Sequence, residues 1–230
     1  MTAGKKFKKL NRKFFTGPTL NISKNILGKY LVRRIGKKIL AGKIVETEAY
    51  IGPEDRASHA FLPRSNFRPI TEKRFRLLFS KFGLDTNSIY RKSVRGGGKI
   101  TPRNVAEYMI GGHIYIYLVY GMYWQLNIST GKKGSPECFL IRALEPENGQ
   151  RNLANGPGKL CRWLHLDKSF YGEDVTTSRR LWLEDRGEKI KKSNIASGPR
   201  IGIDYAGPVW AKKPWRIYVK NNPFVSASKS

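Results

Sequence analysis

The chain has 230 residues, and 40% of them are hydrophobic, which is enough for a buried core and excludes a wholly disordered protein. Its 44 lysines and arginines outnumber 17 aspartates and glutamates, so the formal net charge at pH 7 is +27. This surplus favours a nucleic acid partner over a membrane or a charge that serves only solubility, because each phosphate neutralised by a basic side chain releases a condensed counterion.

The N-terminal part predicts a basic arm followed by a helix and two strands. Residues 1–16 are basic and of low complexity, which indicates a flexible arm that either adds non-specific DNA affinity or is merely solvated. A short helix is expected near Ile22–Gly28. Tyr30–Arg34 and Ile39–Tyr50 are predicted strands joined by a Gly-Lys-Lys turn.

Residues 60–100 differ in character, since they are basic and poorly periodic. Within them, Thr71–Phe82 has apolar residues at helical spacing and Thr71 as a candidate N-cap, so a helix is expected there. Its apolar side is expected to pack on the protein body, and a partner-binding face is the alternative. We expect residues 17–230 to form a single domain that includes this segment.

The C-terminal part is rich in predicted strands. His113–Val119 and Trp124–Ser129 are expected to form a hairpin, and Cys138–Leu144 a third strand. A helix is expected to open at Asn155–Gly158, and Trp215–Val219 is the last predicted strand. Strands outnumber helices and no long crossover segments separate them. We therefore predict an α+β fold with a curved, mainly antiparallel β-sheet, flanking helices and a protruding β-hairpin.

The strand around Glu48 carries the first candidate site. Strand alternation places Ile44, Glu46, Glu48 and Tyr50 on one face, so a potential base lies beside an aromatic wall. The pattern by itself is weak, because glutamate and tyrosine are both common on strands. Arg142 lies in an apolar strand and requires a carboxylate partner, for which Glu48 is the candidate. A purely structural ion pair is the alternative.

Aromatic residues form the second candidate set. Tyr115 and Tyr117 share one strand face, while Tyr120 stands at the hairpin tip, where it can wedge between base pairs. An aromatic cluster covering a sheet, or stacking in a single-strand binder, would use the same residues. His59 is either a site residue or a hydrogen-bonded structural histidine. A base, aromatic faces and a wedge together fit cleavage of a purine N-glycosidic bond in a flipped nucleotide.

Several ordered motifs extend over most of residues 16–230. They are Val45–Asp55 with His59, Thr101–Asn104, Tyr115–Tyr123 with Asn127, Leu140–Pro146, Asn155–Cys161, Arg200–Asp204 and Lys212–Tyr218. On these motifs the chain resembles the alkyladenine (3-methyladenine, N-methylpurine) DNA glycosylase family. The resemblance implies a base-excision repair enzyme that flips damaged purines out of double-stranded DNA and hydrolyses the N-glycosidic bond, leaving an abasic site. Its expected substrates are 3-methyladenine, 7-methylguanine, hypoxanthine and ethenoadenine.

The resemblance also implies the role of each matching residue. Glu48 would be the general base that activates water, and Arg142 would help to hold that water. The flipped base would lie between the side chains of Tyr50, His59 and Tyr117, and His59 would also hydrogen-bond it. Two more positions complete the expected site: Asn127, which would disfavour guanine from the pocket floor, and Tyr120, which would fill the gap in the duplex.

The resemblance further implies a monofunctional glycosylase without lyase activity, with no metal and no cofactor. We expect the protein to act as a monomer. No apolar run reaches the roughly 18 residues of a membrane span, and no signal peptide is apparent. Cys138 and Cys161 have apolar neighbours and are expected to be buried free thiols. We therefore expect an intracellular, DNA-associated protein of the cytoplasm, nucleoid or nucleus. A catalytically inactive nucleic-acid-binding protein on the same fold is the alternative, and an RNA-binding accessory protein is a third possibility.

Two segments depart from the family pattern. Residues 60–100 form a basic insertion where the family has a short turn, and the link between Pro146 and Asn155 is short and lacks the family's helix. We hypothesise that the inserted helix Thr71–Phe82 partly replaces the missing one or extends the basic DNA surface.

Overall fold

The computed structural model describes residues 7–61 and 100–226. In this part of the chain a nine-stranded sheet has the order β1-β7-β2-β3-β6-β5-β4, and β9 pairs with both β3 and β8. The strands are β1 (Lys8–Lys9), β2 (Tyr30–Ile35), β3 (Lys38–Ile51), β4 (Ile114–Val119), β5 (Tyr123–Ser129), β6 (Glu137–Pro146), β7 (Leu181–Asp185), β8 (Ile195–Gly198) and β9 (Arg216–Val219). Every recorded pairing between these strands is antiparallel, which confirms the predicted α+β class.

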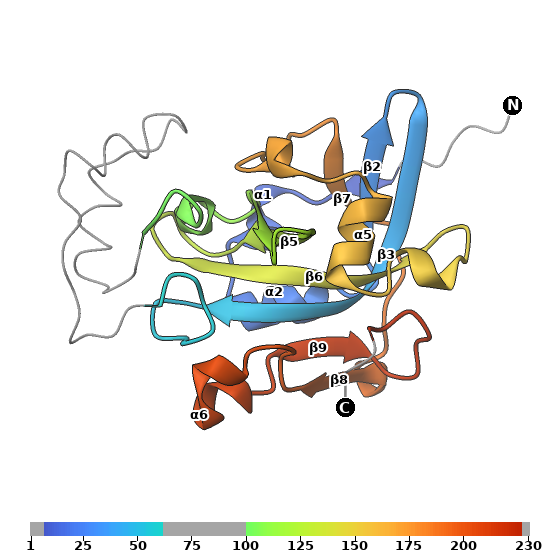
Figure 1. Cartoon of the computed structure of the whole chain (residues 1–230). Coiled ribbons are helices and arrows are strands. Elements are labelled where there is room, and N and C mark those ends of the chain that lie inside the picture. The colour runs from blue at the N-terminus through green and yellow to red at the C-terminus, as the bar shows by residue number, and fades with distance from the viewer. Residues whose placement is uncertain (1–6, 62–99, 227–230) are drawn as a thin grey trace, which may run out of the picture.

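Short helices flank the sheet. The α-helices are α1 (Arg12–Phe15), α2 (Thr19–Asn25), α5 (Pro157–Trp163) and α6 (Pro208–Ala211). One-turn 3-10 helices are η3 (Val105–Tyr108), η4 (Arg151–Leu153), η5 (Lys168–Phe170), η6 (Lys192–Asn194) and η7 (Asp204–Ala206). Figure 1 shows α5 beside the strands on one side of the sheet and the β8–β9 pair with α6 on the other. The helix predicted to open at Asn155–Gly158 is confirmed as α5, and Leu160 and Leu164 are fully buried.

The long strand β3 organises the sheet. Its first half pairs with β2, its second half pairs with β9, and β6 lies along its other edge. The β3–β6 register shifts on either side of Glu46, which leaves Val45 and Arg142 as extra residues. Such bulges break strict alternation. Ile44 therefore belongs to the main hydrophobic core, and Val45 packs with Phe224, so the predicted common face of Ile44 and Glu46 is wrong.

The N-terminal residues differ from the predicted arm over residues 1–16. Residues 1–6 lie outside the described residues, but β1 pairs with β7 and α1 follows it directly. Leu10 and Phe15 are both buried, and Phe15 has no exposed surface. The folded body therefore includes residues 8–15, because these apolar side chains contribute to the main core.

The other predictions have mixed outcomes. The helix expected near Ile22–Gly28 begins earlier, at Thr19, and ends at Asn25. The predicted insertion at 60–100 lies almost entirely outside the described residues, and so does the predicted helix at residues 71–82. The short link after Pro146 contains only η4. The prediction of buried free thiols at Cys138 and Cys161 is confirmed.

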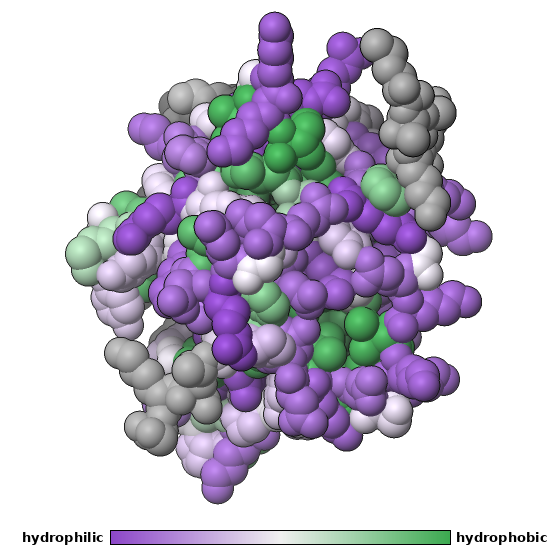
Figure 2. Space-filling model, turned by 90° about the vertical axis from the view of Figure 1, so that its right-hand side faces the viewer, coloured by the Kyte–Doolittle hydropathy of each residue, from purple (hydrophilic) through white to green (hydrophobic). Residues whose placement is uncertain are grey.

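The surface seen in Figure 2 is mostly hydrophilic, with hydrophobic residues in small groups. This view faces the right-hand side of Figure 1, and the turn of the β2–β3 hairpin is at the top in Figure 1. Among the described residues, no helix has both the length and the apolar composition that a membrane span needs. A surface of this kind suits contact with water or a polar partner.

Candidate active site

A single cavity of about 770 Å³ gathers most of the predicted site residues. Its walls come from the end of β3, from β4 to β6 and from the segment after β8. The predicted residues that line it are Tyr50, His59, Tyr117, Tyr120, Asn127 and Arg142. Glu48 lies behind this wall, since its side chain is fully buried while its partners Tyr50, Arg142 and Ile201 reach the cavity.

Glu48 is held by three polar groups. Its Oε1 accepts a hydrogen bond from the backbone N–H of Ile201 at 2.8 Å, and Arg142 Nη1 lies 3.2 Å from the same oxygen. Its Oε2 accepts a hydrogen bond from the hydroxyl of Tyr50 at 2.9 Å. An ionised carboxylate offers roughly four acceptor positions, so the described residues leave about one free on Oε2. The carboxylate is thus fixed in place, and its partners among the described residues do not saturate it.

Arg142 joins two buried carboxylates. The expected pairing with Glu48 is present, and Arg142 Nε also lies 3.3 Å from Glu46 Oε1. Burial alone would lower the pKa of Arg142, but the two carboxylates outweigh it and raise that pKa above its ordinary value. Glu46 also pairs with Arg216 at 3.0 Å and accepts the backbone N–H of Ser226 at 2.8 Å. Glu46 therefore anchors the C-terminal segment, while Glu48 faces the cavity wall.

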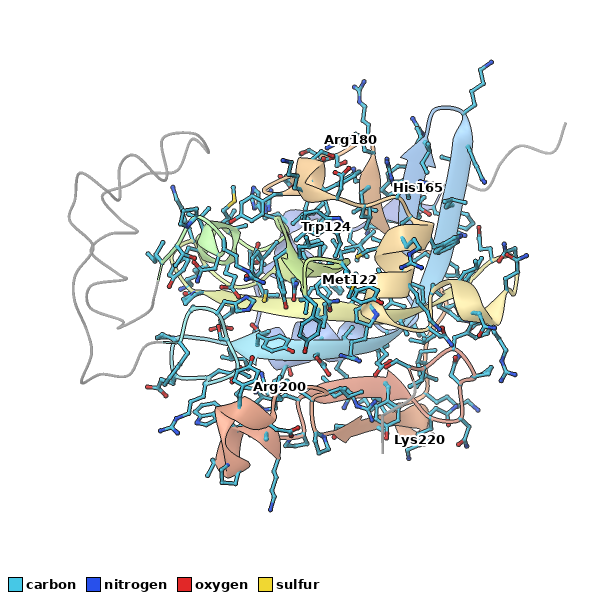
Figure 3. All side chains as sticks on the ribbon, viewed as in Figure 1. Met122, Trp124, His165, Arg180, Arg200 and Lys220 are labelled. Atoms are coloured by element: carbon cyan, nitrogen blue, oxygen red, sulfur yellow. The ribbon has the colours of Figure 1, made fainter. Side chains whose placement is uncertain are left out.

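The groups around Tyr50 keep its hydroxyl protonated and hold its ring in place. Burial, followed by the charge of Glu48, raises the pKa of Tyr50 well above its ordinary value, so its hydroxyl remains a hydrogen-bond donor. The guanidinium of Arg200 stacks on the Tyr50 ring at 4.7 Å. Arg200 binds Asp55 through two hydrogen bonds of 2.5 and 2.8 Å, and both side chains are fully buried. Figure 3 shows Arg200 between β3 and the β8–β9 layer.

An aromatic cluster forms the opposite wall. The ring centroids of His59 and Tyr117 are 4.6 Å apart at an interplanar angle of 76°. A hydrogen bond of 2.5 Å joins His59 Nδ1 to the hydroxyl of Tyr115, whose ring centroid lies 5.1 Å from that of Tyr117. This bond fixes the orientation of the imidazole ring. Strand alternation predicts only that Tyr115 shares a strand face with Tyr117, and the bond to His59 is seen only in the structure.

Asn127 has little freedom to turn. Its Nδ2 donates to the backbone carbonyl of Tyr115 at 3.2 Å and to that of Gln125 at 3.3 Å. Its Oδ1 lies 3.9 Å from the thiol of Cys138, which can donate to it. These partners hold a rigid amide on the cavity wall, so this side of the cavity cannot easily enlarge.

Tyr120 stands at the rim of the cavity, on the tip of the β4–β5 hairpin. It is 85% exposed, and its φ of 52° lies in the left-handed region that non-glycine residues avoid. Gly121 follows with a φ of 69°, and Met122 N–H donates to the Val119 carbonyl, which closes a tight turn. The fold therefore holds a large aromatic side chain in water at some conformational cost, which points to a contact with a partner.

The sequence analysis missed Glu107, an acidic residue of the cavity wall. Glu107 lines the cavity and is only 1% exposed. The sequence does contain an indication of its burial, because Glu107 lies in the apolar run Val105–Met109 just as Arg142 lies in an apolar strand. Within residues 7–61 and 100–226, no three or more histidine, cysteine, aspartate or glutamate side chains gather as ligands for a metal ion.

Known proteins are similar to this chain over most of its length. The family model for methylpurine-DNA glycosylase matches residues 13–82 and 92–223. A protein of Methanocella arvoryzae, provisionally named a 3-methyladenine DNA glycosylase, is 39% identical and covers 94% of this chain and 95% of its own length. The DNA-3-methyladenine glycosylase of Mus musculus is 35% identical over 95% of this chain, which spans 61% of the mouse protein. The corresponding protein of Homo sapiens is 33% identical over 95% of this chain, which spans 68% of it.

Proposed function

The chain belongs to the methylpurine-DNA glycosylase family, and we propose that it removes alkylated or deaminated purines from double-stranded DNA as a monomeric, monofunctional enzyme. The observation that carries this proposal is the buried carboxylate of Glu48. It lies behind an aromatic cavity with an arginine alongside, and the described residues leave one of its acceptor positions open. A protein that only binds DNA has no need of this arrangement.

The proposed reaction uses Glu48 as a general base. A water molecule donates a hydrogen bond to the free position on Glu48 Oε2, and Arg142 helps to hold it. As the C1′–N9 bond of the flipped nucleotide breaks, its electron pair goes to the purine. The water oxygen then bonds to C1′ and its proton passes to Glu48. The products are a free purine and an abasic site.

The aromatic wall explains the proposed preference for damaged purines. Alkylated purines are electron-poor or cationic, so they stack well on the electron-rich faces of Tyr50 and Tyr117. His59 is oriented by Tyr115 to hydrogen-bond the base. The rigid amide of Asn127 would crowd the exocyclic amino group of guanine, which disfavours the normal base.

We expect the Tyr120→Ser variant to excise a lesion at least about tenfold more slowly from a paired duplex than the wild type does. The reason is that the wedge stabilises the extrahelical nucleotide, and unstacking costs a few kcal/mol. At a mismatched site the base is already loosened, so the defect should shrink there. Single-turnover excision on both duplexes measures the difference.

Met122→Ser is the matched control, because Met122 is 66% exposed on the same turn. It is expected to remain close to the wild type on both duplexes. Equal losses for Tyr120→Ser on paired and mismatched duplexes would contradict the wedge role.

Undamaged duplex DNA is expected to bind in a strongly salt-dependent manner. With a net charge of +27, binding should neutralise several phosphates, and each lowers the slope of log K against log salt concentration by about 0.9. Fluorescence anisotropy from low to physiological salt measures that slope. A flat response would show that the basic side chains do not contact phosphates.

The activity itself is tested with duplexes that each carry one hypoxanthine, ethenoadenine or methylated purine. We expect strand breaks only after hot alkali, which cleaves abasic sites left by a glycosylase without lyase activity. Breaks before alkali would reveal a lyase. Tight binding without breaks on any lesion would favour an inactive DNA-binding protein.

A further inference from the structure

The carboxyl group of Glu107 has no role in the reaction described so far. Glu107 lies in η3, which packs against β4, β5 and β6, and its side chain lines the cavity. Its Oε1 faces the Cys138 thiol at 3.5 Å. Its Oε2 is buried and has no hydrogen-bond partner among the described residues. A buried polar atom without a partner is costly for folding, so its presence on the wall of a binding cavity suggests a partner that arrives with the substrate.

The surroundings keep this carboxyl group protonated. Burial raises the pKa of Glu107 to about 8, and the nearby polar side chains of Cys138 and Asn104 offset only part of that effect. The charge of the Asp55 carboxylate adds to the rise. Among the described residues, no lysine, arginine or histidine is a cause of the shift in the Glu107 pKa. The group therefore carries an O–H at neutral pH that can be donated into the cavity.

The other titratable groups near Glu107 do not compete for this role. Burial is the first cause that raises the pKa of Tyr115, Tyr171 and Cys138, and the negative charge that Glu107 carries once it has ionised adds to it. Tyr108 and Tyr117 behave in the same way. These phenols and the thiol hold their protons far more strongly than a carboxylic acid does, so Glu107 is the strongest acid among them.

We propose that Glu107 is the proton donor for neutral leaving purines, which adds a second acid–base residue to the function proposed above and rests on it. The C1′–N9 bond breaks with its electron pair passing to the purine, and the Glu107 O–H proton moves to a ring nitrogen of that purine. The purine leaves uncharged. Water adds to C1′ and gives its proton to Glu48, and exchange with solvent then restores both carboxyl groups.

Cationic bases give the internal comparison. A base such as 3-methyladenine already carries the positive charge in DNA and leaves as a neutral molecule without further protonation. Glu107 should therefore matter for ethenoadenine and hypoxanthine but not for 3-methyladenine. A purely structural role of Glu107 would affect all lesions alike.

The test is single-turnover excision by Glu107→Gln, which keeps the shape of the side chain but cannot transfer the proton. We expect about a 100-fold loss on ethenoadenine and little change on 3-methyladenine. Glu137→Gln, which alters a carboxyl group outside the cavity, should leave the ratio of the two rates unchanged. Equal losses on both lesions, or none on ethenoadenine, would overturn the proposal.

A pH profile of the wild-type enzyme tests the same idea without a variant. Ethenoadenine does not itself titrate near neutral pH, so its excision rate should fall about tenfold per pH unit above about pH 8, where Glu107 loses its proton. The ratio to the 3-methyladenine rate removes the effect of other titrating groups. A constant ratio, or a wild type that excises 3-methyladenine but no neutral lesion, would overturn the role of Glu107 alone. No excision of any lesion would overturn the proposed function and this inference together.

Discussion

The Glu48→Gln variant is expected to lose about a thousandfold in single-turnover excision while binding lesion-containing DNA with nearly unchanged affinity. Glutamine has the shape of glutamate, and its amide oxygen can still accept from the Ile201 N–H and from Arg142. It cannot take a proton from water, so the loss should appear in the chemical step. A binding assay run in parallel with alkali cleavage separates the two effects.

Glu46→Gln is the control for Glu48→Gln. Both residues are fully buried and both contact Arg142, but the other partners of Glu46 are Arg216 and Ser226, which do not line the cavity. We expect this variant to lower stability and to retain excision at a temperature at which it is folded. If Glu48→Gln kept a tenth or more of wild-type excision, Glu48 would not be the base.

The Arg200→Met variant is expected to lose about 3–5 kcal/mol in the free energy of unfolding. Arg200 forms two hydrogen bonds with Asp55 and a third, of 2.9 Å, with the carbonyl of Ala49 on β3. Neither member of the pair has an exposed side chain, so removal of the guanidinium leaves a buried carboxylate without its cation. Urea denaturation of the wild type and the variant measures the difference.

Arg180→Met is the matched control, because Arg180 pairs with Glu173 through a side chain that is 47% exposed. Solvent screens such a pair, so this variant should lose no more than about 1 kcal/mol. Figure 3 shows Arg180 near the top of the view and far from Arg200. If the two variants lost the same stability, the buried pair would not be a main support of the fold.

The strands with strong local signals could be predicted without a structure. Alternating apolar residues mark β3, β4 and β5, and the apolar run of β6 is equally clear. The strands β7 and β8 were missed because they are short and are stabilised by partners distant in sequence. The apolar residues Leu10 and Phe15 were hidden in a basic segment, so their burial was missed as well.

The sequence by itself determined the basic charge, the sheet-rich fold and, through ordered motifs, the residues that gather at the cavity. Only the tertiary structure decided how the side chains at the cavity are oriented and which partners they contact. The β3–β6 bulges set the face of Glu48, Arg200 meets Asp55 from 145 residues away, and one Glu107 oxygen has no partner among the described residues. The physical reason is that periodicity reports the environment of one segment, whereas hydrogen-bond partners and buried charges depend on which distant segments meet.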